Sequence, residues 1–137
     1  MEKKNKLVKY YLYNYKKIDD IIEERRMEII EKVCSNLSNY MRGINTVESQ
    51  AIALIEDKKI NDLKRWQVYI KNILVFFRKK NPLSYKFIIL KYFYKRTDDE
   101  IRKMLKLNLK QIKYIDNKII SLLIKISEKE NMERIGG

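Results

Sequence analysis

Residues 97–123 read TDDEIRKMLKLNLKQIKYIDNKIISLL, and this stretch decides the fold. It predicts a short helix, a corner at residues 106–108 and a longer helix. Thr97 and Glu100 form a capping box, in which the Thr hydroxyl accepts a hydrogen bond from the amide three residues later and the Glu reaches back. Asn108 and Gln111 repeat the spacing at the start of the second helix. The stretch therefore predicts two helices joined by a tight corner.

The second helix, from Leu109 to about Ser127, has two faces. The spacing of its apolar residues predicts a core stripe made of Ile112, Ile115, Ile119, Leu122, Leu123 and Ile126. Polar and aromatic residues lie off that stripe, namely Lys110, Gln111, Lys113, Tyr114, Asn117 and Lys118. A helix that reads a DNA groove needs this division. Lys side chains reach phosphates or guanine, and Gln and Asn pair with adenine.

Further bases precede this helix pair. Residues 78–96 hold seven bases and no acid, and Asn81-Pro82 predicts the start of the helix within them. We expect phosphate contacts on the flanks from Lys91, Lys95, Arg96 and Arg102. In the short helix, the predicted inner face is Ile101, Met104 and Leu105, with Leu107 as a buried pivot at the corner. Asp116 is expected on or near the exposed face, where it would repel phosphates.

The N-terminal third predicts a helical arm, residues 1–44, ahead of a helical body, residues 45–137, with the helix-turn-helix at about 82–127. A first helix over Asn5–Lys17 would bury Leu7, Tyr10, Tyr11 and Tyr15, with Leu12 flanking them, and core packing is favoured over base stacking. Residues 18–31, with six acids and two bases, predict an acidic helix that faces away from phosphates or pairs with basic helices. Residues 35–46 predict a loop. A long helix from Val47 towards Lys79 follows, with a kink or a break at residues 56–59.

Composition narrows the class of protein. The 137 residues carry 31 bases and 18 acids, a formal net charge of +13, which favours a polyanionic partner. Low Gly and Pro content and helical spacings predict an all-α fold. The absence of His and the single Cys34, expected to be a packed thiol, argue against an enzyme, a metal site and a cofactor. No long apolar run or signal peptide is apparent, so we expect a cytoplasmic protein without a membrane span.

The spacing of Ile101, Leu105, Leu107, Asn108, Ile112, Ile119 and Leu123 resembles region 4 of the sigma-70 class. Two positions differ from that pattern: Arg102 replaces a small residue, and Lys106 replaces the Gly of the turn. The segments NTVESQAIALIEDKKINDLKRW, FIILKYFYKRTDDEI and IKYIDNKII resemble the ArpU/RinA group of phage and prophage late-gene transcriptional regulators. This resemblance spans about Tyr10 to Ile126. It implies an N-terminal helical arm, a sigma-like helix-turn-helix and positive control of late phage operons.

Two hypotheses about function follow. The first is a sequence-specific regulator of transcription that binds double-stranded DNA. The second is an interaction protein that docks on RNA polymerase or associates with itself, without specific DNA binding. We also expect a homodimer. The long apolar stripe from Val47 to Phe77 could form its interface, and many DNA-binding proteins use two copies to bind two half-sites. A protein that fails to bind DNA but still captures polymerase would favour the second hypothesis.

Overall fold

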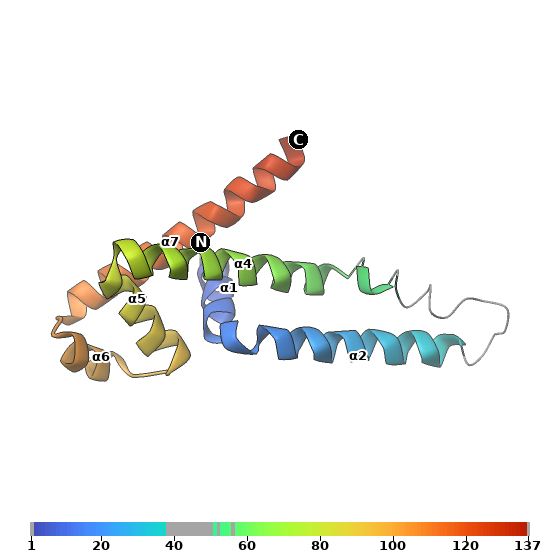
Figure 1. The fold of residues 1–137 in the computed structure, drawn as a ribbon, viewed down its shortest axis with the longest axis horizontal. Helices are drawn as coiled ribbons and strands as arrows, with labels where there is room; N and C mark the ends of the chain where they lie inside the picture. Colours follow the sequence, from blue (N-terminus) through green and yellow to red (C-terminus); the bar gives the residue numbers. More distant parts are fainter. Residues whose placement is uncertain (1, 38–50, 52, 56, 137) are drawn as a thin grey trace. The chain divides into compact units, whose positions relative to one another are not determined.

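The computed structural model describes residues 2–37, 51, 53–55 and 57–136, and every regular element within those residues is helical. The predicted all-α class is therefore confirmed. The elements, labelled in part in Figure 1, are α1 (Glu2–Tyr13), the 3₁₀ turn η1 (Tyr15–Lys17), α2 (Ile18–Leu37), α4 (Lys58–Lys80), α5 (Pro82–Ile88), the π-helical turn η2 (Ile89–Phe93), α6 (Asp98–Leu105) and α7 (Leu109–Gly136).

The contacts divide the chain into two compact units. One unit combines Met1–Lys16 with Trp66–Gly137, and the other is Lys17–Arg65, so α4 runs from one into the other. The predicted boundary at residue 44 lies outside the described residues. Helix α1 belongs to the same unit as the C-terminal helices because it contacts α7 and η2. It therefore packs in the same compact unit as α5, α6 and α7.

In the Lys17–Arg65 unit, one carboxylate has two structural tasks. Asp57 precedes α4, and its Oδ1 accepts a hydrogen bond from the Ile60 amide at 2.9 Å, which caps the helix. Its Oδ2 also lies 2.8 Å from Nη2 of Arg25 on α2. Hydrogen bonding to Arg25 lowers the pKa of the Asp57 carboxyl below its usual value. The predicted interruption at residues 56–59 is thus a helix start rather than a kink.

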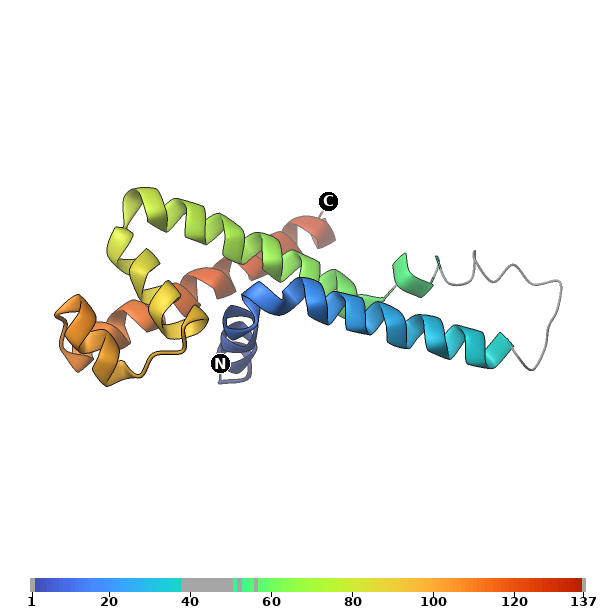
Figure 2. The same cartoon turned by 60° about the horizontal axis from the view of Figure 1, so that its bottom comes forward.

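The core of the other unit is apolar and aromatic, and it gathers around α5 and η2. Its buried side chains follow helical spacing on each element: Val8, Tyr11, Leu12, Trp66, Ile70, Ile73, Phe77, Phe87, Ile88, Tyr92, Ile101, Ile112, Ile119, Ile120 and Leu123. Figure 2 shows α5, α6 and the beginning of α7 grouped together. Residues Ile70, Ile73 and Phe77 of the stripe proposed for dimer contact are buried inside the chain.

The predicted inner face of α1 is partly wrong. Leu7 and Tyr10 are 46% and 44% exposed, while Val8, Tyr11 and Leu12 are buried. The buried face is set by the partner that α1 meets: the Tyr11 ring stacks on Trp66 with centroids 5.0 Å apart. The sequence of α1 does not identify this partner. Because α1 has apolar residues on several sides, it could pack against the core in more than one orientation. Core packing of the Tyr residues is nevertheless confirmed for Tyr11.

Three other predictions need correction. Cys34, predicted as a packed thiol, is exposed. Met104, predicted on the inner face of the short helix, is 57% exposed because α6 is only two turns long and buries Ile101 alone. Residues 35–37, predicted as loop, continue α2 to Leu37. The remainder of the predicted loop, residues 38–46, lies outside the described residues.

Candidate nucleic-acid interface

The ends of α6 form as the sequence predicts. Thr97 is the N-cap: its Oγ1 accepts from the Glu100 amide at 3.2 Å, and the Thr97 amide donates to Oε1 of Glu100 at 3.1 Å. The capping box is complete, so two amides that a helix start leaves without partners are satisfied. These hydrogen bonds from Thr97 lower the pKa of the Glu100 carboxyl. The start of α6 is therefore fixed by local sequence alone.

The corner after α6 uses a left-handed residue. Lys106 has φ 58° and ψ 48°, and the Leu107 amide donates to the Arg102 carbonyl at 3.1 Å. That six-to-one hydrogen bond is the signature of a Schellman C-cap. In this motif the left-handed position, here Lys106, is usually held by Gly. The sequence lacks the Gly, yet the corner closes all the same. Leu107 is half-buried there rather than fully buried.

The start of α7 is capped by the predicted pair. Oδ1 of Asn108 accepts from the Gln111 amide at 2.8 Å, and Oε1 of Gln111 accepts from the Asn108 amide at 2.9 Å. Because Gln111 holds the cap, its carbonyl oxygen is already engaged and only its amide group remains to donate. Ile112, Ile119 and Leu123 are buried and anchor the helix. The predicted core residues Ile115, Leu122 and Ile126 are only half-buried.

The predicted polar face of α7 is exposed. All six of its side chains, which lie within the first three turns of the helix, are exposed: Lys110, Gln111, Lys113, Tyr114, Asn117 and Lys118. Nζ of Lys118 lies 5.9 Å from the centre of the Tyr114 ring, within the range of a cation–π contact. The structure thus brings all six together on one element.

The predicted exposure of Asp116 is wrong. Asp116 is 7% exposed and points into the unit, where the Tyr92 hydroxyl donates to its Oδ1 at 2.5 Å. Nζ of Lys91 lies 3.2 Å from its Oδ2 and 3.8 Å from Asp98. Burial, followed by the charge of Asp116, raises the pKa of the Tyr92 phenol, so the hydroxyl keeps its proton and remains a donor. The carboxylate is paired internally and is withdrawn from the outer face of α7.

The structure divides the bases predicted to contact DNA into a group that pairs with an acid and a group that does not. Lys91 is 17% exposed and bound to Asp116, so it belongs to the interior pairing. Arg96 and Arg102 form exposed ion pairs with Glu100 and Asp99 at 3.5 Å and 3.3 Å. Pairs of this kind are weak and yield to a phosphate.

Four predicted bases belong to the group without an acidic partner. Among the described residues no acid lies within ion-pair distance of Lys95, Lys110, Lys113 or Lys118. The cations without an acidic neighbour therefore include three on the first turns of α7 and one, Lys95, in the loop before α6. Lys95 is itself left-handed, with φ 55°.

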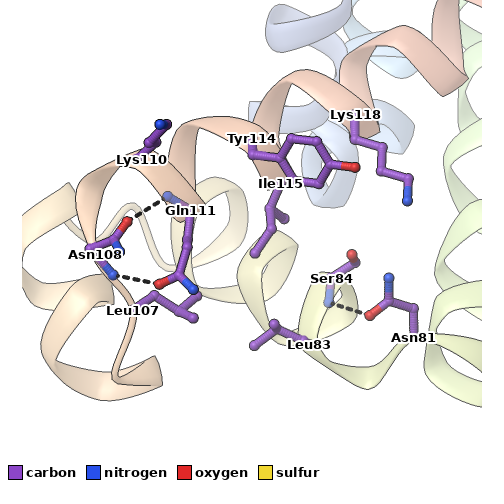
Figure 3. A pocket seen from close by; sticks show the side chains of 10 residues that line it. All are labelled: Asn81, Leu83, Ser84, Leu107, Asn108, Lys110, Gln111, Tyr114, Ile115 and Lys118. Atoms are coloured by element: carbon purple, nitrogen blue, oxygen red, sulfur yellow. Dashed lines mark hydrogen bonds between the residues drawn. The ribbon is translucent and has the colours of Figure 1, made fainter.

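A groove runs beside this face, between α7 and the first turn of α5. It has a volume of about 500 Å³ and ten lining residues: Asn81, Leu83, Ser84, Leu107, Asn108, Lys110, Gln111, Tyr114, Ile115 and Lys118. Figure 3 shows Tyr114, Ile115 and Lys118 of α7 across from Leu83, Ser84 and Asn81. Nothing in the sequence reasoning identified this groove, because its two walls are far apart along the chain.

Comparisons with known proteins identify no relative. No family model, no curated protein and no solved structure matches the chain. Within the described residues, no cluster of three or more potential metal ligands occurs. None of the described helices is long and apolar enough to cross a membrane.

Proposed function

We propose that this protein is a sequence-specific, DNA-binding regulator of transcription, with α6 and α7 as its helix-turn-helix. One observation carries the proposal: α7 is anchored by Ile112, Ile119 and Leu123, and it leaves Lys110, Lys113 and Lys118 exposed without an acidic neighbour in the described chain. A helix held in this way enters a major groove with its first turns and donates to base edges and phosphates.

The electrostatics support the same proposal. The chain has a formal net charge of +13, and Asp116, the acid on α7 nearest these lysines, is buried against Tyr92 and Lys91. A phosphate that approaches the first turns of α7 therefore meets cations and neutral donors. Arg96 and Arg102 are released from their exposed pairs at little cost and add contacts on the flank. Lys95 lies in the same loop as Arg96.

A more specific role rests on the resemblance to the ArpU/RinA group. If that resemblance reflects ancestry, the protein activates late genes of a phage or prophage and works beside RNA polymerase. The six residues on α7 would then read an operator upstream of those genes. The alternative, a polymerase-docking or self-associating adaptor, predicts normal partner binding and no preference among DNA sequences.

The first experiment selects binding sites from a random duplex library and measures the affinity of the selected DNA by fluorescence anisotropy. The test variant is Lys110→Ala with Lys113→Ala and Lys118→Ala. We expect the selected DNA to bind at least a hundredfold more tightly than random DNA, and the triple variant to lose that preference. The log–log salt slope should also fall by about 2–3, near 0.9 for each lost phosphate contact.

The matched control replaces three exposed lysines of α4 instead: Lys64, Lys71 and Lys79. It removes the same charge from a surface outside the helix-turn-helix. Equal losses in the two triple variants would mean that only net charge matters, and the proposal of sequence-specific reading by α7 would fail. Binding that shows no preference for any sequence would favour the adaptor.

A further inference from the structure

We infer that the groove between α5 and α7 docks an acidic amphipathic helix from a partner protein, and that this partner and DNA exclude each other. The exclusion rests on the proposed function, because the groove shares four residues with the proposed DNA face: Lys110, Gln111, Tyr114 and Lys118. The docking itself rests on the lining of the groove alone.

The side-chain amide oxygens in the groove are already occupied. Oδ1 of Asn81 accepts from the Ser84 amide at 3.3 Å, which caps α5. Asn108 and Gln111 cap α7 through their reciprocal hydrogen bonds at 2.8 and 2.9 Å. A ligand that competes for these oxygens would open two helix starts. Recognition is therefore left to the apolar side chains and to donors, namely the two lysines and the side-chain NH2 groups of these amides, and such donors suit a carboxylate.

The remaining surface selects an apolar anchor. Leu83 is 39% exposed and Tyr114 is 66% exposed, and the half-buried Leu107 and Ile115 also line the groove. A DNA phosphate placed against Leu83 and Ile115 would lose water without gaining a donor, which is costly. A leucine or phenylalanine side chain gains from the same burial. The volume of about 500 Å³ admits several such side chains.

The charge of the rim selects an acidic partner. Lys110 and Lys118 are the charged residues of the lining, and no acid is among its ten members. The two lysines are eight residues apart on α7, which is about 12 Å along the axis. A trough between two helices suits a third helix whose contacting residues lie at i, i+3, i+4 and i+7, with the apolar anchors at i+3 and i+4. Its carboxylates should stand about two turns apart on either side of the anchors.

The test uses a fluorescein-labelled 16-residue peptide of Ala and Gln with Glu at positions 4 and 11 and Leu at positions 7 and 8. A control isomer moves both Leu residues to the opposite helix face. Anisotropy with the full chain should show at least tenfold tighter binding of the first peptide. Leu83→Ser should weaken it by about tenfold, the usual effect of losing a buried anchor of 1–2 kcal/mol. Leu109→Ser is the matched control, since Leu109 is 42% exposed and outside the lining.

Equal binding of the two peptides, or equal effects of Leu83→Ser and Leu109→Ser, would overturn the docking. A ternary complex of peptide, DNA and protein would overturn the exclusion. Lys113 separates the inference from the proposed function, because it is on the polar face of α7 but not in the groove. Lys113→Gln should weaken DNA binding and leave peptide binding within twofold, because it adds no negative charge beside Lys110. If it weakens neither while Leu83→Ser still weakens the peptide, the docking stands and the reading of DNA by α7 fails.

Discussion

The hydrogen bond from Tyr92 to Asp116 gives a prediction about stability. Tyr92→Phe removes one oxygen and keeps the ring, which is fully buried and packs edge-on against Tyr13 with centroids 4.7 Å apart. A hydrogen bond to a charged group contributes about 1.5–3 kcal/mol. Lys91 still pairs with Asp116 in the variant, at 3.2 Å, so the carboxylate keeps one partner. We expect the free energy of unfolding to fall by about 2 kcal/mol.

Urea unfolding measures this change. The chain has a single tryptophan, Trp66, which stacks on Tyr11 inside the same unit and reports its unfolding by fluorescence. The midpoint should fall while the slope with urea stays constant, because the surface exposed on unfolding is the same. Tyr94→Phe is the matched control: Tyr94 is 60% exposed and only two residues away, so its change should stay within about 0.5 kcal/mol.

An Asp116→Ala protein tests whether the Tyr92 hydroxyl acts through this carboxylate. In an Asp116→Ala protein the Tyr92 hydroxyl has lost its acceptor, so adding Tyr92→Phe should cost close to nothing. If Tyr92→Phe costs the same with and without Asp116, the hydroxyl does not act through this carboxylate. A cost equal to that of Tyr94→Phe in the wild-type background would show that the buried pair contributes nothing to stability.

Three further predictions concern the corner, the cap and the salt slope. Lys106→Gly should stabilise the protein by up to about 1 kcal/mol in urea unfolding, because Gly adopts φ 58° without the Cβ penalty, whereas Lys106→Ala should be neutral. Asp57→Asn keeps the cap but removes the charge that faces Arg25. Since the pKa of Asp57 is lowered in the fold, its contribution is present above about pH 4 and is lost as the pH falls through the folded value. Thermal unfolding at a series of pH values should therefore show wild type and variant converging in acid, and a constant difference would contradict the ion pair. Lys91→Met should lower stability in urea yet leave the salt slope of DNA binding unchanged, because Nζ faces Asp116; a slope reduced by about 0.9 would instead place Lys91 on a phosphate.

The elements that the sequence predicted well are those set by neighbours along the chain. The capping box at Thr97 and the cap at Asn108 each involve residues three apart, so their geometry follows from local sequence. Pro82 likewise begins α5 as predicted. The alternation of core and polar residues on α7 correctly predicted that Ile112 and Ile119 are buried. A single apolar stripe is enough to orient such a helix against the core.

The elements that the sequence did not predict depend on contacts between distant segments. Asp116 reads as a surface acid until Tyr92, 24 residues earlier, is brought beside it. The buried face of α1 follows from its contact with Trp66, more than fifty residues away. The groove needs Leu83 and Tyr114 on facing elements. In each case the local pattern allowed two orientations, and the tertiary partner selected one of them.

The buried carboxylate of α7 also determines which side of that helix faces outward. A buried ion pair is a poor source of stability, because desolvation offsets much of the attraction, and an apolar residue at position 116 would fill the same space. An apolar residue, however, tolerates a rotated helix, whereas the carboxylate must meet both Tyr92 and Lys91. Turning α7 by one residue, about 100°, would carry Asp116 away from both, leaving the buried Tyr92 hydroxyl unsatisfied and Lys91 with only the more distant Asp98 at 3.8 Å. The same rotation would turn Lys113 away from its present face, so the pairing that holds Asp116 inside holds the lysines of α7 outside.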